Sequence, residues 1–258
     1  MVRSFLQSLR LGMRYWGTAM YCPLCERTAR VFLPNTKELP GQKTIDRYHI
    51  VAMGKRSNYR CPWCNSTDKE RLVWWYLSQL SLAGKRILHV APERVTRRKL
   101  EQVPGIDYVC GDKFYGHSRY SDGRYEGAEN IDITSLPYTE QSFDLIICNH
   151  VLEHVEDDTR ALSELYRVLK PGGQAIPQVP ISYDTPTIED RTIQTEKERE
   201  IAFGQVDHVR IYGTDYPSRL EQAGFSVIDI GPEDRPSLDR LGVNPREHLY
   251  IANRPLPL

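Results

Sequence analysis

Apolar and polar positions follow two different periods along residues 84–258, and the periods predict different elements. Runs of six or seven mostly apolar residues predict strands at 86–91, 107–112, 143–149, 174–180, 225–230 and 247–253. Amphipathic segments predict helices from the first strand to Gln102, from Asp157 or Asp158 to Lys170, and at 214–224. The run at 130–137 fits a strand or a turn. Short strands that alternate with amphipathic helices predict an α/β fold with a doubly wound, mostly parallel sheet covered on both faces.

The first third of the chain shows another pattern. Apolar residues at helical intervals predict an N-terminal helical arm at 1–17, with a helix on a membrane surface as the alternative. Thr67 and Glu70 form a capping-box pattern that begins another helix. Runs at 31–34 and 48–53 predict short strands of a ribbon. We therefore divide the chain into the arm, a small module with a linking helix at 18–82, and a large domain at 83–258 with an insertion at about 181–213.

Composition and charge indicate a globular protein and give no sign of a membrane span or of a nucleic-acid-binding surface. The 258 residues are 40% hydrophobic and 26% charged, as in ordinary globular proteins. The 34 basic residues equal the 34 acidic ones, so nucleic-acid binding is not expected, although a local basic patch stays open. No apolar run reaches the length of a membrane span. Residues 1–17 lack a signal-peptide pattern, so we expect a cytoplasmic protein with reduced cysteines.

Four of the six cysteines form two closely spaced pairs. Cys22 and Cys25 lie in "CPLC", and Cys61 and Cys64 lie in "CPWC". Two intervening residues allow both sulfurs of a pair to reach one ion, and two pairs complete the tetrahedral shell of a structural Zn²⁺ site. Unpaired buried cysteines and a redox pair are the alternatives. A shell of four thiolates leaves no open position, so we expect this zinc to be architectural.

The run "NIDITSLPYTEQSFDLIICNHVLEHVEDDTRALSELYRVLKPGG" resembles the central part of class I S-adenosylmethionine-dependent methyltransferases of type 11. The resemblance covers about residues 84–180. The patterns "CPxCxSxxxxRLxxxYL", "LHVAPE" and "FGQxDHVRxYG" are similar to those of a bacterial branch that contains a zinc ribbon. The resemblance implies a Rossmann-like sheet, S-adenosylmethionine as cofactor and methyl transfer as activity.

The loop after the first predicted strand departs from the family pattern of an acid followed by three spaced glycines. His89 stands in place of the acid, and Ala91, Glu93 and Val95 stand in place of the glycines. We interpret "HVAPE" as a variant cofactor loop in which Glu93 meets the α-ammonium of the methionine moiety. A purely structural loop is the alternative.

Other cofactor contacts follow from the resemblance by position. Asp112 is expected to hold the ribose hydroxyls, and Asp132 the adenine amino group while Ile133 packs on the ring. Asn149 ends the fourth strand, beside the expected position of the sulfonium.

Candidate acceptor-side residues follow two strand ends. His150 lies in "NHVLEH", where we interpret His154 as structural. The insertion contains "DHVRIYG", in which His208 offers a base, Arg210 an anion clamp and Tyr212 a hydroxyl. Anchoring of the insertion is the alternative for these three residues. Long insertions of this kind often act as lids or substrate walls.

Three functions remain open on the sequence. The first is methyl transfer to an O or N atom of a small molecule, such as a sugar or secondary metabolite. The second is methylation of RNA or protein delivered by the zinc ribbon. The third is non-catalytic binding by a degenerate methyltransferase domain. The sequence indicates neither the acceptor nor the oligomeric state.

Overall fold

The computed structural model describes residues 13–113, 127–234 and 236–257. The predicted N-terminal arm lies mostly outside these residues; of its described part, residues 13–15 are helical. Among the described residues, no helix has the length and apolar character needed to cross a bilayer.

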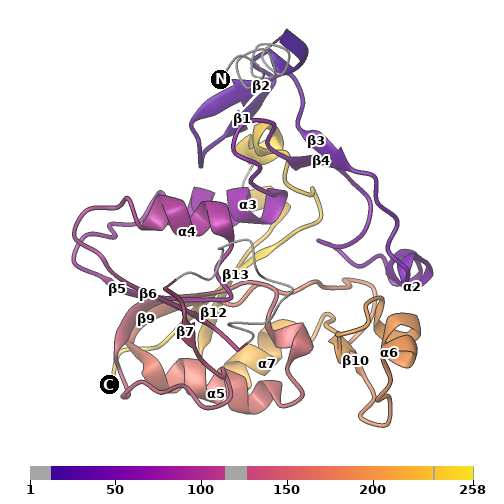
Figure 1. Ribbon diagram of the computed structural model, residues 1–258. Coiled ribbons are helices and arrows are strands. Elements are labelled where there is room, and N and C mark those ends of the chain that lie inside the picture. Colours follow the sequence, from indigo (N-terminus) through magenta and orange to yellow (C-terminus); the bar gives the residue numbers. More distant parts are fainter. Residues whose placement is uncertain (1–12, 114–126, 235, 258) are drawn as a thin grey trace.

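A seven-stranded sheet forms the centre of the molecule, in the order β12-β13-β9-β8-β5-β6-β7 (Figure 1). Its strands are β5 (Arg86–Val90), β6 (Asp107–Asp112), β7 (Glu129–Asn130), β8 (Phe143–Cys148), β9 (Leu169–Ile176), β12 (Ser226–Ile230) and β13 (Leu249–Asn253). The pairs among β5 to β9 are parallel, whereas β13 runs antiparallel to both of its neighbours. The doubly wound sheet predicted from the sequence is therefore confirmed.

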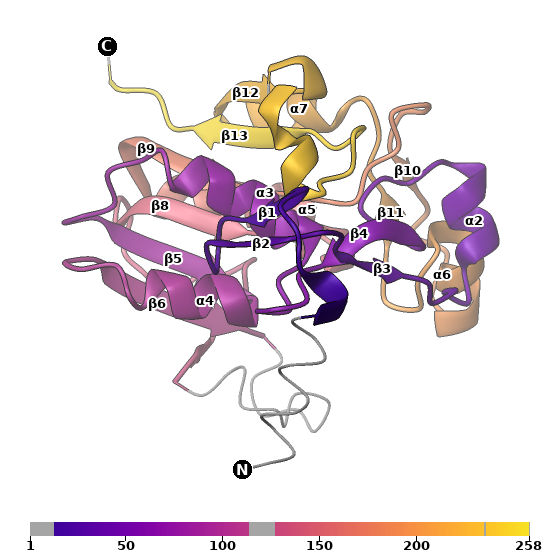
Figure 2. The same ribbon diagram turned by 90° about the horizontal axis from the view of Figure 1, so that it is seen from above.

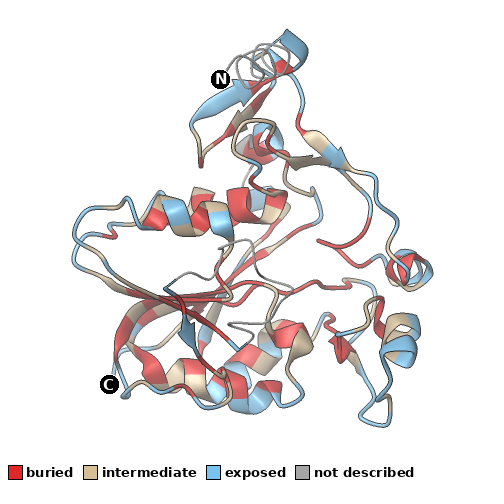
Figure 3. Cartoon of the chain, viewed as in Figure 1, coloured by how far each residue is buried: buried red, intermediate tan, exposed pale blue. Residues whose placement is uncertain are grey.

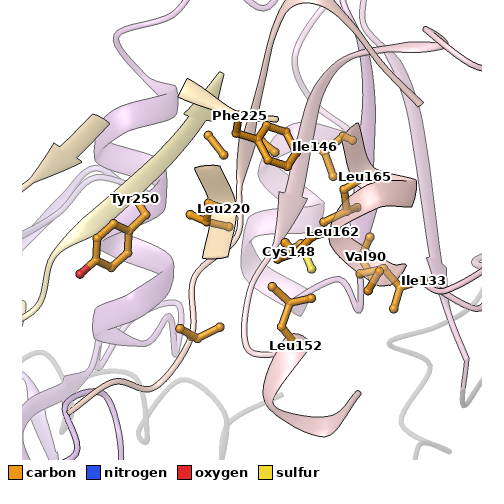
Figure 4. Packing of buried hydrophobic residues seen from close by; sticks show 14 of the residues in the cluster. Val90, Ile133, Ile146, Cys148, Leu152, Leu162, Leu165, Leu220, Phe225 and Tyr250 are labelled. Atoms are coloured by element: carbon orange, nitrogen blue, oxygen red, sulfur yellow. The ribbon is translucent and has the colours of Figure 1, made fainter. Parts of the chain in front are cut away.

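Helices cover both faces of the sheet (Figure 1). One face carries α3 (Asp68–Leu77) and α4 (Arg94–Leu100), and the other carries α5 (Asp158–Val168) and α7 (Tyr216–Gln222). The inward side of α5 is buried and its outward side exposed (Figure 3), because its apolar residues recur at helical spacing. Figure 4 shows Leu162 and Leu165 packed with Val90, Ile146 and Cys148 of the sheet.

The small module consists of two antiparallel ribbons beyond α3. The first pairs β1 (Met20–Cys22) with β2 (Arg27–Ala29), and the second pairs β3 (Leu33–Asn35) with β4 (Arg56–Arg60). A hydrophobic cluster continues from this module through α3 to the sheet, joining Cys22, Leu72 and Ile87. The predicted boundary at residues 82 and 83 thus crosses a continuous core and stays a prediction.

The insertion contains β10 (Ile188–Glu189), α6 (Glu196–Phe203) and β11 (Arg210–Ile211). Figure 2 shows α6 beside α2 (Gln42–Arg47), and Thr44 Oγ1 donates to the carbonyl of Ile201 at 2.6 Å. Ile45 and Phe203 share a small hydrophobic cluster. The insertion therefore contacts the N-terminal module as well as its own domain. Three short 3-10 segments complete the described elements: η2 (Leu152–His154), η3 (Pro232–Asp234) and η4 (Pro236–Leu241).

Two local predictions were wrong. The helix expected to reach Lys170 ends at Val168, and "KPGG" lies inside β9. Pro171 disfavours the helical conformation of the residue before it, and Gly172 adopts φ 75°. The run 48–53 is not a ribbon strand, because Val51 forms a bridge with Ile181 of the large domain instead.

Candidate functional site

The four paired cysteines come together although they lie on two knuckles far apart in sequence. Cys22 Sγ lies 3.6 Å from Cys64 Sγ, and Cys25 Sγ lies 3.8 Å from Cys61 Sγ. Sulfurs at the corners of a tetrahedron, about 2.3 Å from a central zinc, stand about 3.8 Å apart. Ser66 Oγ lies 3.2 Å from the sulfurs of both Cys22 and Cys64. These two distances fit a tetrahedral zinc shell, and all four sulfurs lie within 4.8 Å of one another.

Arg71 fixes this module to the rest of the molecule. Its side chain is fully buried, and its guanidinium donates to the carbonyl oxygens of Asn58 at 2.6 Å and Ser66 at 2.8 Å. It also donates to the carbonyl of Leu241 near the C-terminus. A buried arginine is tolerated here because its donors meet several carbonyl acceptors. The arrangement is consistent with an architectural module.

A different polar cluster lies at the carboxyl ends of β5 and β8. Along the chain, β6 is added on one side of β5, whereas β8 and β9 are added on its other side. The order in which strands are added therefore reverses at the parallel pair of β5 and β8. Ligands of doubly wound folds bind at such a switch point. Glu93 follows β5, and Asn149 and His150 follow β8. Three predicted site residues therefore lie at the expected crevice.

Hydrogen bonds connect the two strand ends. Glu93 Oε2 lies 2.8 Å from His89 Nε2, and Asn149 Nδ2 donates to Glu93 Oε1 at 3.0 Å. His89 is fully buried, and its Nδ1 lies 2.9 Å from the hydroxyl of Tyr108. Burial by itself raises the pKa of Glu93, but its contacts with His89 and Asn149 outweigh burial and lower this pKa. Glu93 therefore carries a negative charge at the crevice.

The backbone is strained at the same two strand ends. Ala91 adopts φ 49° and His150 adopts φ 54°, in the left-handed region that non-glycine residues rarely enter. The amide of Ala91 donates to the Gly111 carbonyl at 2.8 Å, and that of His150 to the Gln178 carbonyl at 2.7 Å. Such strain costs about 1–3 kcal/mol per residue and is concentrated at functional sites. Ala91 thus takes the kind of backbone conformation for which glycine is usually required.

A cleft of about 370 Å³ opens between these strand ends and the small module. One wall contains Ala91, Glu93, Asn149 and His150, and the opposite wall contains Tyr59, Arg60, Cys64 and Lys69. Its volume lies within the range of small-molecule sites. A larger cavity of about 560 Å³ lies elsewhere, between β1, α3 and η4. We favour the smaller cleft because the polar strand-end residues line it.

Buried polar atoms at the cleft lack partners among the described residues. They are Asn149 Oδ1 and His150 Nε2. Glu153, which contacts His150 through Oε1, has a further unpartnered atom in Oε2. Buried polar atoms are almost always hydrogen-bonded in folded proteins, so unpaired ones indicate a missing water, ion or ligand. The ammonium of Lys69, on the opposite wall, also forms no hydrogen bond or ion pair within the described part of the chain.

Glu153 orients His150. Its Oε1 lies 3.2 Å from His150 Nδ1. Burial raises the pKa of Glu153, but the nearby imidazoles of His150, His154 and His208 outweigh burial and bring it to about 2. Burial, together with the Lys69 ammonium, lowers the pKa of His150. A neutral His150 that donates through Nδ1 to the charged carboxylate keeps an unshared pair on Nε2, as a proton acceptor needs.

The remaining predicted cofactor residues lie along the neighbouring strand ends. Asp112 ends β6 and is buried. Asp132 accepts from the amide and hydroxyl of Thr134 at 2.9 and 2.7 Å and pairs with Lys113 at 2.7 Å. Burial raises the pKa of Asp132, but Lys113 and Thr134 bring it to about 2. Ile133 is buried in the hydrophobic core. Their cofactor roles stay predictions.

The predicted residues of "DHVRIYG" lie outside the lining of the cleft. Arg210 donates to the carbonyls of Leu152 at 3.0 Å and Glu156 at 2.9 Å, and also to that of Val155. The Tyr212 hydroxyl donates to Asp158 at 2.9 Å and is fully buried. These contacts favour anchoring of the insertion, and roles in catalysis stay predictions.

His208 is buried beside Glu153 and His154. Burial lowers its pKa to about 4, so its imidazole is neutral near pH 7. The sequence indicated no site position for Lys69, and it named Glu153 within "NHVLEH" without a role of its own. Lys69 belongs to the linking helix, so no local pattern connects it with a strand end of the other domain. The "NHVLEH" motif contained a signal for Glu153, since a carboxylate three residues after a histidine can reach it across one turn.

Comparison with known proteins finds its matches in the segment that contains these strand ends. Residues 85–176 match the methyltransferase domain family. A demethylmenaquinone methyltransferase of Renibacterium salmoninarum is 32% identical over 119 residues, which cover 45% of this chain and 49% of that protein. A ubiquinone/menaquinone biosynthesis C-methyltransferase of Xanthomonas oryzae is 37% identical over 89 residues, or 34% of this chain and 26% of that protein.

The matched region thus spans about half the length of the first relative and about a quarter of the second. Among solved structures, the chain is similar to the 1,6-didemethyltoxoflavin-N1-methyltransferase of Burkholderia thailandensis, with 16% identity and a TM-score of 0.46. That alignment covers 72% of this chain and 76% of the other. The sequence match coincides with strands β5, β6, β7, β8 and β9, whose ends form the crevice. Residues 85–176 of this chain, which carry the crevice, therefore match the methyltransferase domain family.

Proposed function

We propose that this protein transfers a methyl group from S-adenosylmethionine to an O or N atom of a small-molecule acceptor, such as a sugar or secondary metabolite. The family match at residues 85–176 supports the cofactor and the reaction. Within the structure, the main support is a pair of buried atoms at the switch point of the sheet, Asn149 Oδ1 and His150 Nε2. Neither atom has a hydrogen-bond partner among the described residues.

The crevice residues fit the methionine end of the cofactor. An α-ammonium group needs acceptors, and the Glu93 carboxylate and Asn149 Oδ1 offer them side by side. An α-carboxylate needs a cation, and the unpaired Lys69 ammonium lies on the opposite wall. Asp112 would hold the ribose hydroxyls, and Asp132 and Ile133 the adenine. In this proposal the small module closes one end of the cofactor site.

When bound, S-adenosylmethionine supplies a methyl group that its sulfonium has already activated. The chain's part is to align the acceptor, exclude water and accept a proton where the acceptor carries one. His150 Nε2 would accept this proton at the cleft, while Glu153 holds the imidazole through Nδ1. The cleft volume of about 370 Å³ suits a small acceptor better than a macromolecule.

We further propose that Cys22, Cys25, Cys61 and Cys64 bind one Zn²⁺ ion with an architectural role. The spacing of the sulfurs and the closed set of four thiol ligands support it.

Calorimetry with S-adenosylmethionine and its demethylated product tests the proposed cofactor. Wild-type protein should bind both, and Asn149→Ala should weaken binding about 10- to 100-fold, as for a lost hydrogen bond to a charged group. Glu101→Gln, at the far end of α4, is the matched control and should bind as wild type does. Failure of the wild-type chain to bind either compound would contradict the proposal.

Transfer of a labelled methyl group to a panel of small hydroxyl and amine acceptors tests the reaction. With an acceptor identified, His150→Ala should lower turnover by about 10²–10⁴-fold and leave cofactor affinity nearly unchanged. Equal losses in both would place His150 in the cofactor wall instead.

A further inference from the structure

A second cluster of metal-binding side chains lies behind the cleft, away from the cysteines. It consists of Glu153 and His154 on η2 and His208 just before β11. One ligand atom from each residue lies within 4.8 Å of the other two, and His154 Nε2 is 4.0 Å from Glu153 Oε1. Glu153 and His208 are almost fully buried, at 1% and 2% exposure. Two imidazoles and one carboxylate thus meet in a site largely closed to solvent.

The unused atoms of this cluster are the ones that a metal ion would take. Glu153 Oε2 is buried without a hydrogen-bond partner in the described part of the chain. Neither ring nitrogen of His208 forms a hydrogen bond there, and its ring contacts that of His154 edge-on at 4.7 Å. A buried carboxylate oxygen next to an unbonded imidazole is costly unless a further group satisfies both.

The atoms that are already bonded orient these ligands. His154 Nδ1 lies 3.1 Å from the carbonyl oxygen of Asp207, which leaves Nε2 free on the side of Glu153. Glu153 Oε1 forms a hydrogen bond with His150 Nδ1, which leaves Glu153 Oε2 without a hydrogen-bond partner among the described residues. Metal-ligating histidines usually donate their second ring nitrogen to a carbonyl or carboxylate in this way.

The backbone around the cluster is held from both sides. The amide of Val209 donates to the carbonyl of Glu153 at 2.9 Å, which joins the two segments that carry the ligands. Arg210 donates to three carbonyls of the η2 region, those of Leu152, Val155 and Glu156. In this arrangement Arg210 is a positioning residue for Glu153, His154 and His208. The ligands therefore sit on a fixed framework rather than on a free loop.

We propose that Glu153, His154 and His208 bind a divalent transition-metal ion, with zinc as the best match to two imidazoles and one carboxylate. Ligand atoms about 2.0–2.1 Å from a tetrahedral zinc stand about 3.4 Å apart, so binding would draw these side chains together by about an ångström. Three protein ligands leave a fourth position open, as in catalytic rather than structural zinc sites. This site is separate from the four cysteines and does not depend on methyl transfer.

Metal stoichiometry tests the inference. The full chain is incubated with zinc, desalted and analysed for metal, and wild-type protein should hold two equivalents, one in each site. His208→Ala and His154→Ala should each hold one. His49→Ala removes an exposed imidazole elsewhere and should still hold two. His154→Ala guards against a folding failure, because this side chain is partly exposed.

Cobalt substitution provides a second readout in the same variants. The thiolate site gives an intense sulfur-to-cobalt charge-transfer band, which reports an intact small module, whereas the nitrogen–oxygen site gives only weak visible bands. We expect His208→Ala and His154→Ala to keep the charge-transfer band and to lose the weak bands. A single equivalent in wild-type protein, or two equivalents in both variants, would overturn the inference whether or not the chain binds S-adenosylmethionine.

Discussion

The cysteine cluster and the strand-end crevice are both assembled from distant segments, but they differ in whether their polar atoms have partners. The four sulfurs lie within 4.8 Å of one another, and the neighbouring Arg71 donates to carbonyl acceptors on several segments. At the crevice, Asn149 Oδ1 and His150 Nε2 are buried without partners. A closed set of ligands holds a structure together, whereas an open set is available to a substrate or cofactor.

Lys69 connects the two regions. It belongs to the helix that follows the second cysteine knuckle, but its side chain lines the cleft across from Glu93. The small module therefore contributes a wall to the crevice in addition to its own cysteine cluster. One module therefore contains both kinds of side chain: its cysteines form the closed cluster, whereas its Lys69 lines the cleft.

The largest expected effect concerns the architectural region. Cys61→Ala removes one of four sulfurs, and we expect loss of zinc and of the folding free energy it supplies, which reaches about 10–16 kcal/mol in isolated zinc fingers. Thermal unfolding and metal analysis measure both quantities. Cys110→Ala, a buried cysteine of β6 outside the cluster, should retain zinc. Full zinc content and unchanged stability in Cys61→Ala would end the architectural interpretation.

The next effect concerns the anchoring of the insertion. Arg210→Ala leaves three carbonyl oxygens of the η2 region without their donor and removes one of the two cations, Arg210 and Arg219, that pair with Asp158 and Glu189. Because a buried ion-pair network loses a partner, we expect a loss of about 3–5 kcal/mol of folding free energy. Denaturant unfolding measures it. The exposed Arg246→Ala should cost under about 1 kcal/mol. Unchanged stability with weakened acceptor binding would instead support the anion clamp predicted from the sequence.

The smallest effect tests whether the small module contributes to the crevice. Lys69→Met removes an unpaired, half-buried cation, so we expect S-adenosylmethionine affinity to fall by about 1.5–3 kcal/mol, because hydrogen bonds to charged groups have this value. Stability should change little or rise, since burial lowers the pKa of Lys69 and its ammonium forms no ion pair with the residues that the structure describes. Calorimetry and denaturant unfolding separate the two quantities.

Lys43→Met, on the exposed side of α2, is the matched control for Lys69→Met and should change neither quantity. Undiminished cofactor affinity in Lys69→Met would confine the role of the small module to architecture and would restore a simple division between the two regions.

The sequence by itself determined the fold class and the pairing of the cysteines, and it predicted most elements of the large sheet. The two periods of apolar residues predicted the doubly wound sheet, because the spacing of apolar residues along the chain shows whether one face or both faces of an element are buried. The pairs at Cys22, Cys25, Cys61 and Cys64 were recognisable because a short knuckle fixes the distance between its two sulfurs. The resemblance to methyltransferases then placed Glu93 and Asn149 at the crevice.

Only the tertiary structure decided which polar atoms are used and which remain free. Ala91 and His150 take left-handed backbone conformations that no local pattern indicates. For Arg210 and Tyr212, the sequence predicted a role at the acceptor and left anchoring of the insertion as the alternative. Their hydrogen bonds to the η2 region and α5 favour anchoring. Lys69 faces the cleft because α3 packs on the sheet. Sequence order specifies burial and short-range geometry, but the partner of a long polar side chain depends on which distant segments fold against it.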